Sequence, residues 1–161
     1  MSQVNPAIPV GPDHPDLPVK PPLVWLLALV LGWWLHRFMP LPSRGSAFGW
    51  VGLVVLAAGV LLALWSLLSL RAAQTPVEPW KATRSIVDRG PYAFTRNPIY
   101  LAFAIVVLGA GLWIDRFAVV VMVVPALLVT DRVIVRREER YLTRKFGEAY
   151  LSYRQRVRRW I

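Results

Sequence analysis

The sequence contains no cysteine, and it has only two histidines, His14 and His36, among its 161 residues. A chain without cysteine forms no disulfide framework, no thiolate metal site and no cysteine nucleophile. The two histidines lie far along the chain from the polar motifs described below, which argues against a histidine-based metal site and against a Ser/His/Asp triad. We therefore predict no bound metal ion.

Acidic residues are also scarce: nine Asp and Glu stand against 19 Lys and Arg, and the formal net charge is +10. A chain this basic could bind nucleic acid. The basic residues, however, flank long apolar runs and form no basic domain of their own. This placement favours the charge asymmetry of a membrane protein and attraction to anionic lipid, so we expect a bilayer as partner and no nucleic acid.

Apolar residues are abundant, at 56% of the chain with a mean hydropathy of +0.46, which exceeds what the surface of a soluble domain allows. They are clustered into long runs. This predicts an all-α fold, namely an integral membrane bundle of four transmembrane helices. The expected helices cover residues 23–39, 48–70, 98–114 and 117–135.

Three glycines in the second apolar run predict close contacts with a neighbouring helix, because glycine lets two backbones approach each other. They are Gly49, Gly52 and Gly59. The alternative is that these glycines admit a ligand.

The two ends of the chain differ in character. Residues 1–22 are rich in proline and predict a flexible tail, whereas residues 23–161 form a single membrane domain. Residues 136–159 are too charged to cross a membrane, but their apolar residues recur every three or four positions. This predicts an amphipathic helix on the membrane surface, which Gly147 could interrupt. Its apolar face holds Leu142, Phe146, Tyr150, Tyr153 and Val157.

The distribution of Lys and Arg predicts the orientation of the chain. With both termini inside, the inner segments hold 16 of the 19 basic residues, and the outer turns hold only Arg37, Arg44 and Arg116. By the positive-inside rule both termini are cytoplasmic, in an inner membrane of bacterial type.

The polar stretch at residues 89–100 opens the third apolar run. Asn97 is a good N-cap and Pro98 suits the first helical position, so a helix is expected to begin here. Its free backbone N–H groups would attract a carboxylate or a phosphate, and Arg96 adds a cation. Tyr92 and Tyr100 supply aromatic faces and hydroxyls. The alternative is an ordinary helix start with an interfacial tyrosine.

Glu138 and Glu139 are two of the few acidic residues, and they follow the fourth apolar run. One carboxylate could accept hydrogen bonds from ribose hydroxyls or from an amino group of a ligand. Because both motifs are expected on the same side of the membrane, they could share one pocket. The alternative is charge balance with exposed neighbours, which contributes little stability. Those neighbours are Arg136, Arg137 and Arg140.

Asp131 is a further ionisable residue beside an apolar run, and such residues are functional candidates by default. Pairing with Arg132, or reaching toward the interface, explains it equally well. We therefore leave Asp131 out of the predicted site.

The paired motifs resemble a known family. Residues 90–100 (GPYAFTRNPIY), followed by residues 138–147 (EERYLTRKFG) and 150–153 (YLSY), are similar to the isoprenylcysteine carboxyl methyltransferase and phospholipid methyltransferase superfamily. Its members are small multi-pass membrane enzymes that use S-adenosyl-L-methionine. The resemblance runs from about residue 84 to the C-terminus.

Glu138, Glu139 and Arg96 are the expected catalytic residues, because a carboxylate can accept a proton and Arg96 adds a cation. The resemblance implies roles in cofactor binding. The residues expected to contact the cofactor are Tyr92, Asn97, Pro98, Ile99, Tyr100 and Glu138.

Two positions depart from the pattern of the superfamily. Asn97 stands where Arg-His-Pro-x-Tyr has histidine, as in the phospholipid N-methyltransferase branch. Ile134 stands where the prenylcysteine enzymes have an arginine that meets the substrate carboxylate, although Arg132 and Arg136 are close by and are the candidates for substrate contact.

The resulting hypothesis is methyl transfer from S-adenosyl-L-methionine to a lipophilic or amphiphilic acceptor, whose nucleophile is a carboxylate, an amine or a thiol. No glycine-rich loop follows a strand, so a soluble Rossmann methyltransferase is not expected. Two alternatives stay open: an NADPH-dependent membrane reductase of related fold, and a membrane module without catalysis. The sequence does not indicate an oligomeric state.

Overall fold

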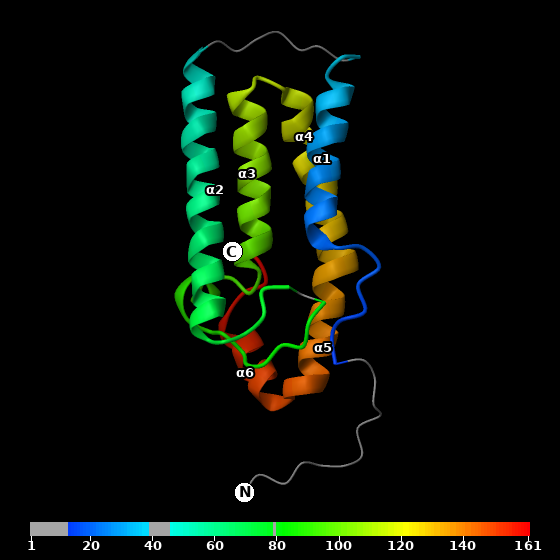
Figure 1. Cartoon of the computed structure of the whole chain (residues 1–161), viewed down its shortest axis with the longest axis vertical. Coiled ribbons are helices and arrows are strands. Elements are labelled where there is room, and N and C mark those ends of the chain that lie inside the picture. The colour runs from blue at the N-terminus through cyan, green and yellow to red at the C-terminus, as the bar shows by residue number, and fades with distance from the viewer. Residues whose placement is uncertain (1–12, 39–45, 79) are drawn as a thin grey trace, which may run out of the picture.

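The computed structural model describes residues 13–38, 46–78 and 80–161, and only the backbone at residues 46–48. Within these ranges the chain is all-α (Figure 1). In chain order the elements are α1 (Pro21–Leu35), α2 (Ser46–Ala72), the 3-10 turn η1 (Gly90–Ala93), α3 (Pro98–Trp113), α4 (Phe117–Val129), the π-helical segment η2 (Thr130–Val135), α5 (Arg136–Phe146) and α6 (Glu148–Arg156).

The four predicted apolar segments are all helical. α1 begins at Pro21 rather than at residue 23, because the fixed φ of proline suits the first turn of a helix. It ends at Leu35, and Met39, the predicted end, lies outside the described residues. α3 begins at Pro98 as predicted, and the fourth segment comprises α4 and η2.

Two helices are long and apolar enough to cross a membrane, Gly49–Ala72 and the continuous helix Phe117–Phe146. The apolar helices α1 and α3 are shorter, with 15 and 16 residues. Large apolar side chains point outward along α1 and α2; Trp50 and Val54, for example, are 70% and 69% exposed. Continuous apolar faces of this kind suit a lipid environment rather than water.

α3 lies between α2 and the other helices, and glycines bring it close to α2. A Cβ added at Gly59 would lie 2.8 Å from the backbone N of Val106, and one added at Gly52 would collide with the backbone at Trp113. Gly109 of α3 meets α2 at Leu56 in the same way. The predicted helix contacts at Gly52 and Gly59 are therefore confirmed, and Gly49 lies at ordinary contact distance from Trp113.

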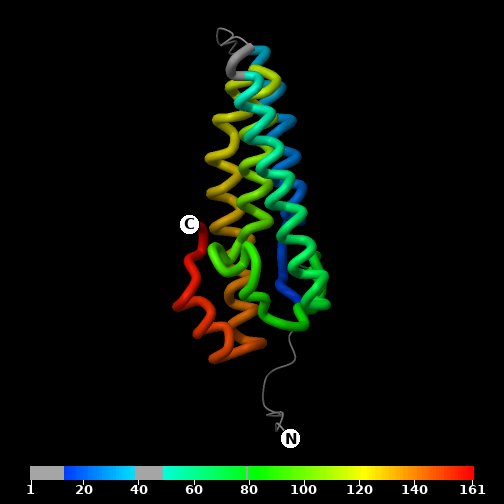
Figure 2. Tube along the Cα trace, turned by 90° about the vertical axis from the view of Figure 1, so that its left-hand side faces the viewer, coloured from blue at the N-terminus to red at the C-terminus, as the bar shows by residue number. Residues whose placement is uncertain are grey.

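α1 packs against α4 on the other side of α3. Val119 contacts Gly32 so closely that a Cβ there would lie 2.6 Å from the Val119 Cα. Trp25, Ala28 and Ala104 join Val119 in a buried apolar cluster. These contacts fix the four helices side by side (Figures 1 and 2).

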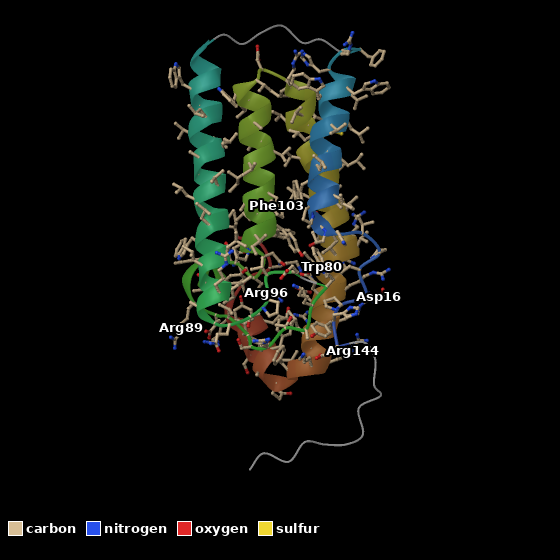
Figure 3. All side chains as sticks on the ribbon, in the orientation of Figure 1. Asp16, Trp80, Arg89, Arg96, Phe103 and Arg144 are labelled. Carbon is tan, nitrogen blue, oxygen red and sulfur yellow. The ribbon has the colours of Figure 1, made fainter. Side chains whose placement is uncertain are left out.

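The polar parts of the chain collect at one end of this bundle. The end of α2, the start of α3, and α5 with α6 all lie there, at the lower end of Figure 1. Nitrogen and oxygen atoms are concentrated at the same end in Figure 3, where Arg96 points inward among the helix ends. The two sequence motifs therefore share one end of the molecule.

Residues 136–159 do not form a single helix, and the interruption lies at Gly147, where the sequence allowed for one. α5 continues the helix of α4 through η2, and Gly147 ends it with a φ of 51°. α6 then turns back, and Tyr150 and Tyr153 are buried within the protein against Ile86 and Leu142. The apolar face that suggested a membrane surface instead packs against the rest of the chain. Residues 157–161 then return toward the bundle (Figure 2).

Candidate functional site

A cavity of about 400 Å³ lies at the polar end of the bundle. The cavity is lined by the last turns of α2, by loop residues within 75–78 and 80–87, by η1, by the start of α3, and by α5 and α6. This volume falls within the usual range for small-molecule sites. Of the residues predicted to act in catalysis or cofactor binding, all line it: Tyr92, Arg96, Asn97, Pro98, Ile99, Tyr100, Glu138 and Glu139.

The start of α3 forms one wall. Asn97 occupies the N-cap position and its carbonyl accepts the first helical bond from Leu101 N at 3.0 Å. Its side chain does not cap the helix, contrary to expectation: Asn97 Nδ2 donates instead to the carbonyl of Arg159 at 2.9 Å. The first-turn N–H groups of an α-helix have no partner within the helix, so this wall carries partial positive charge.

Glu138 and Tyr100 meet in the lining of the cavity, where the Tyr100 hydroxyl donates a short hydrogen bond to Glu138 Oε1. This contact joins α3 to α5 and presents a carboxylate to the cavity. Tyr92 of η1 lies nearby, and burial raises the pKa of its phenol above the ordinary value. Tyr92 therefore stays a neutral hydrogen-bond donor at physiological pH.

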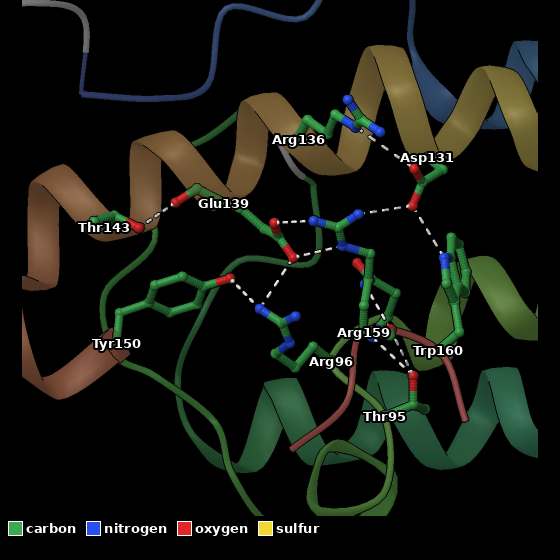
Figure 4. Close-up of polar contacts among 10 residues, drawn as sticks. Thr95, Arg96, Asp131, Arg136, Glu139, Thr143, Tyr150, Arg159 and Trp160 are labelled. Atoms are coloured by element: carbon green, nitrogen blue, oxygen red, sulfur yellow. Dashed lines mark hydrogen bonds and ion pairs between the residues drawn. The ribbon is translucent and has the colours of Figure 1, made fainter. Parts of the chain in front are cut away.

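Glu139 has different partners from its neighbour. Its Oε1 lies 3.0 Å from Arg96 Nη1, and the two side chains are only 11% and 9% exposed. Arg159 binds the same carboxylate at 3.0 and 2.7 Å (Figure 4). Glu139 thus forms a buried ion pair with Arg96, and the alternative of surface charge balance with the arginines of α5 does not hold.

The ion pair with Glu139 engages Arg96 through Nη1. Its Nη1 also lies 3.4 Å from the Tyr150 hydroxyl (Figure 4). Its Nε is buried and has no partner among the described residues. An acceptor on a ligand could satisfy this donor, because a buried N–H without a partner is costly.

The two predicted substrate residues do not line the cavity. Arg132 is exposed, and Arg136 lies 3.6 Å from Asp131 with 57% of its side chain exposed. Asp131 itself accepts hydrogen bonds from Arg159 and from Trp160 Nε1, at 3.3 and 3.0 Å. The structure therefore groups Asp131 with the C-terminal residues rather than with a ligand.

Several cavity residues were not singled out from the sequence. The Tyr141 hydroxyl accepts from Thr83 N at 3.2 Å, which ties the loop to α5. The Tyr153 hydroxyl donates to the carbonyl of Tyr92 at 2.8 Å, which ties α6 to η1. The clustering of tyrosines in the C-terminal third was the available signal, and it indicated an amphipathic helix and a family motif but no place in the cavity.

The described part of the N-terminal segment, residues 13–20, runs beside α5. Lys145 Nζ lies 2.5 Å from Asp13 Oδ1, and Arg137 donates to the carbonyl of Asp16 at 3.1 Å. Pro15 borders the cavity. Among the described residues no group of three or more His, Cys, Asp or Glu side chains could hold a metal ion.

Comparison with known proteins connects this site to a family. The family model for phospholipid methyltransferases matches residues 48–149, which is more than half of the chain. One relative, an uncharacterized protein of Haemophilus influenzae, is 36% identical over 63 residues, which are 39% of this chain and 100% of that protein. No solved structure matches. The chain therefore belongs to the phospholipid methyltransferase family, and this membership implies S-adenosylmethionine-dependent methyl transfer to a lipid-like acceptor.

Proposed function

We propose that the cavity at the polar end of the bundle is where this chain binds S-adenosylmethionine and transfers its methyl group to the headgroup of a membrane lipid or another amphiphile. The observation that carries the proposal is the contact between Tyr100 and Glu138, which joins the two sequence motifs inside one cavity. Residues 38 positions apart meet there in a site large enough for a small molecule.

The residues present fit this cofactor. Its carboxylate would lie at the positive start of α3, where the buried Nε of Arg96 still needs an acceptor. Glu138 would accept from the cofactor amino group or ribose hydroxyls, and Tyr92 and Tyr100 would flank it. When bound, the cofactor supplies an activated methyl group.

The protein contributes positioning and exclusion of water. The cavity is walled by helix ends and by Phe103 and Leu67, whose apolar side chains keep water from the reacting atoms. An amine acceptor must lose a proton, and Glu138 is placed to take it because, among the described residues, its carboxylate meets the Tyr100 hydroxyl and no cation. Glu139 and Arg96 neutralise each other and hold the walls together.

The charges of the cavity favour an amine or thiol acceptor over a carboxylate. Among the described residues that line it, Arg96 is the one cation, and Glu139 already neutralises it. Arg132 and Arg136 lie away from the cavity, so neither is in place to bind a carboxylate there. A prenylcysteine substrate would therefore lack the cation that its carboxylate needs.

We further propose that all four apolar helices cross the membrane and that both termini are cytoplasmic. α1 and α3 would span about 23 Å at 1.5 Å per residue, which is less than the roughly 30 Å hydrocarbon core. Local thinning of the bilayer and flanking residues can make up this difference at modest cost. The outward apolar side chains of α1, such as Leu26 and Leu27, support contact with lipid.

Calorimetric titration with S-adenosylhomocysteine tests the proposal. The wild-type chain should bind, and Tyr100→Phe and Glu138→Gln should each weaken binding by roughly tenfold, which corresponds to about 1.4 kcal/mol. Glu148→Gln is the matched control, because this exposed glutamate of α6 lies outside the cavity. No measurable binding by the wild type, or unchanged binding by both cavity variants, would overturn the proposal.

A further inference from the structure

The chain after α6 is attached to the start of α3. Arg96 N donates to the carbonyl of Arg158 at 3.0 Å. The next carbonyl, of Arg159, accepts from Thr95 Oγ1 at 3.0 Å and from Asn97 Nδ2 at 2.9 Å. Residues 157–161, here called the C-terminal segment, thus bind three consecutive residues at the wall of the cavity.

The side chain of Arg159 reaches the opposite wall. Its guanidinium binds both oxygens of Glu139, through Nε at 3.0 Å and Nη2 at 2.7 Å. Its third nitrogen donates to Asp131 Oδ1 at 3.3 Å, beside Trp160 Nε1 on the same oxygen (Figure 4). A guanidinium bound to a carboxylate by two parallel hydrogen bonds fixes the orientation of both groups.

Arg159 is the residue in which these two sets of contacts meet. Its carbonyl binds the start of α3, and its side chain binds α5 at Glu139 and η2 at Asp131. Glu138, which faces Tyr100, directly precedes Glu139 in the same turn of α5. Arg159 therefore joins the two walls, in addition to the Arg96–Glu139 pair and the Tyr100–Glu138 contact.

We propose that Arg159 is a positioning residue, which sets Glu138 against the start of α3 so that the cavity has the shape that binds the methyl donor. This inference rests on the proposed function. It is not contained in the family match, because that match ends at residue 149 and the C-terminal segment lies beyond it.

The test compares Arg159→Ala with Arg158→Ala. The second variant removes an equal charge from the preceding residue, whose side chain is exposed and whose carbonyl stays in place. S-adenosylhomocysteine should bind Arg159→Ala at least roughly tenfold more weakly than wild type, and Arg158→Ala within about twofold. Arg159→Lys keeps the charge but cannot make the bidentate contact, so its affinity for S-adenosylhomocysteine should lie between those of the two alanine variants.

Hydrogen exchange in the cofactor-free protein gives a second readout that does not depend on the proposed function. Peptides covering residues 94–100 and 136–142 should exchange faster in Arg159→Ala, and the core of α2 should exchange as in wild type. If Arg159→Ala merely unfolds, α2 will lose protection as well. In that case exchange in Arg159→Lys is compared with exchange in wild type instead.

The outcomes separate the two claims. If wild type does not bind S-adenosylhomocysteine, the proposed function fails and the role of Arg159 in binding fails with it. If wild type binds and Arg159→Ala binds equally well, only the positioning role is overturned. Unchanged exchange at residues 94–100 and 136–142 in Arg159→Ala would also overturn it.

Discussion

Glu138 and Glu139 are neighbours in the sequence with different surroundings. Glu138 meets a tyrosine hydroxyl in the cavity, and Glu139 lies between two guanidinium groups. Successive residues of a helix point about 100° apart. In one turn of α5, Glu138 is therefore available to a ligand, whereas Glu139 binds other parts of the protein. The two carboxylates should therefore respond differently to the same substitution.

Glu139→Gln should destabilise the protein, because it leaves two partly buried arginines without their carboxylate. Hydrogen bonds to charged groups contribute about 1.5–3 kcal/mol, so a loss of roughly 2 kcal/mol is expected. For a chain of this size that lowers the melting temperature by roughly 4–8 °C. Thermal unfolding in detergent measures it, with Glu138→Gln as the comparison. Equal melting temperatures for the two variants would contradict this division of roles.

The sequence indicated both glutamates but could not separate them. The motif spacing placed Tyr100 and Glu138 in one site, since both motifs were expected at the same side of the membrane. Which glutamate meets Tyr100 and which meets Arg96 depends on the register of α5, which follows directly from η2. The partners of Glu139 also include Arg159, which lies 20 residues away, and no local pattern predicts that contact.

Among the elements, α2 and α3 are the pair whose separation is fixed most closely by small residues. Glycines on both helices bring the backbones together, and this contact supports the cavity wall formed by the ends of both helices. The long apolar runs predicted these helices well, because length and hydropathy alone determine that signal. The periodicity of residues 136–159 did not reveal the packing of α6, because an amphipathic pattern is the same whether the apolar face meets lipid or protein.

Gly59→Leu should separate α2 from α3. A Cβ at this position already lies 2.8 Å from the Val106 backbone, and overpacking of this kind costs about 1–3 kcal/mol. Ala58→Leu is the matched control, because this neighbour is exposed on the outer face of α2. Thermal unfolding should distinguish the two variants. Similar melting temperatures would show that the contact between α2 and α3 tolerates a large side chain.

Gly147 ends α5 with a φ of 51° and a ψ of −127°, a conformation that residues with a Cβ rarely adopt. No heavy atom lies within 4 Å of a Cβ placed there, so Gly147→Ala would act through the backbone alone. A loss of about 1 kcal/mol is expected, together with weaker binding of α6 to the site. Unfolding of Gly147→Ala in denaturant measures this loss, and an unchanged midpoint would contradict it.

At the scale of the whole molecule, the polar groups gather at one end and the apolar faces cover the rest. This asymmetry agrees with the count of basic residues, since the loop after α2 and the chain after η2 lie together (Figures 1 and 3). The count of Lys and Arg in each loop predicts the orientation of the chain in the membrane, because this count does not depend on which residues are in contact. The shape of the cavity was beyond the sequence, because it depends on how six segments far apart in the chain meet.

The absence of cysteine allows a direct test of orientation. Single cysteines at Arg89 and Arg154, both exposed at the polar end, should react with a membrane-impermeant maleimide in inverted vesicles but not in intact cells. A cysteine at Trp113, which is 54% exposed at the other end of α3, should show the reverse. Labelling of all three from the same side would contradict the proposed spans.

The central claim is methyl transfer at the cavity that Tyr100 and Glu138 share, and transfer of a labelled methyl group tests it most directly. Membranes containing the chain are incubated with radiolabelled S-adenosylmethionine, and lipids are then extracted and separated. The account predicts label in a lipid or other amphiphile with the wild type and with Glu148→Gln, and at least tenfold less with Glu138→Gln, in line with a lost contact of about 1.4 kcal/mol. Label in no extracted product, from a protein that still binds S-adenosylhomocysteine, would contradict it and leave a binding module without catalysis.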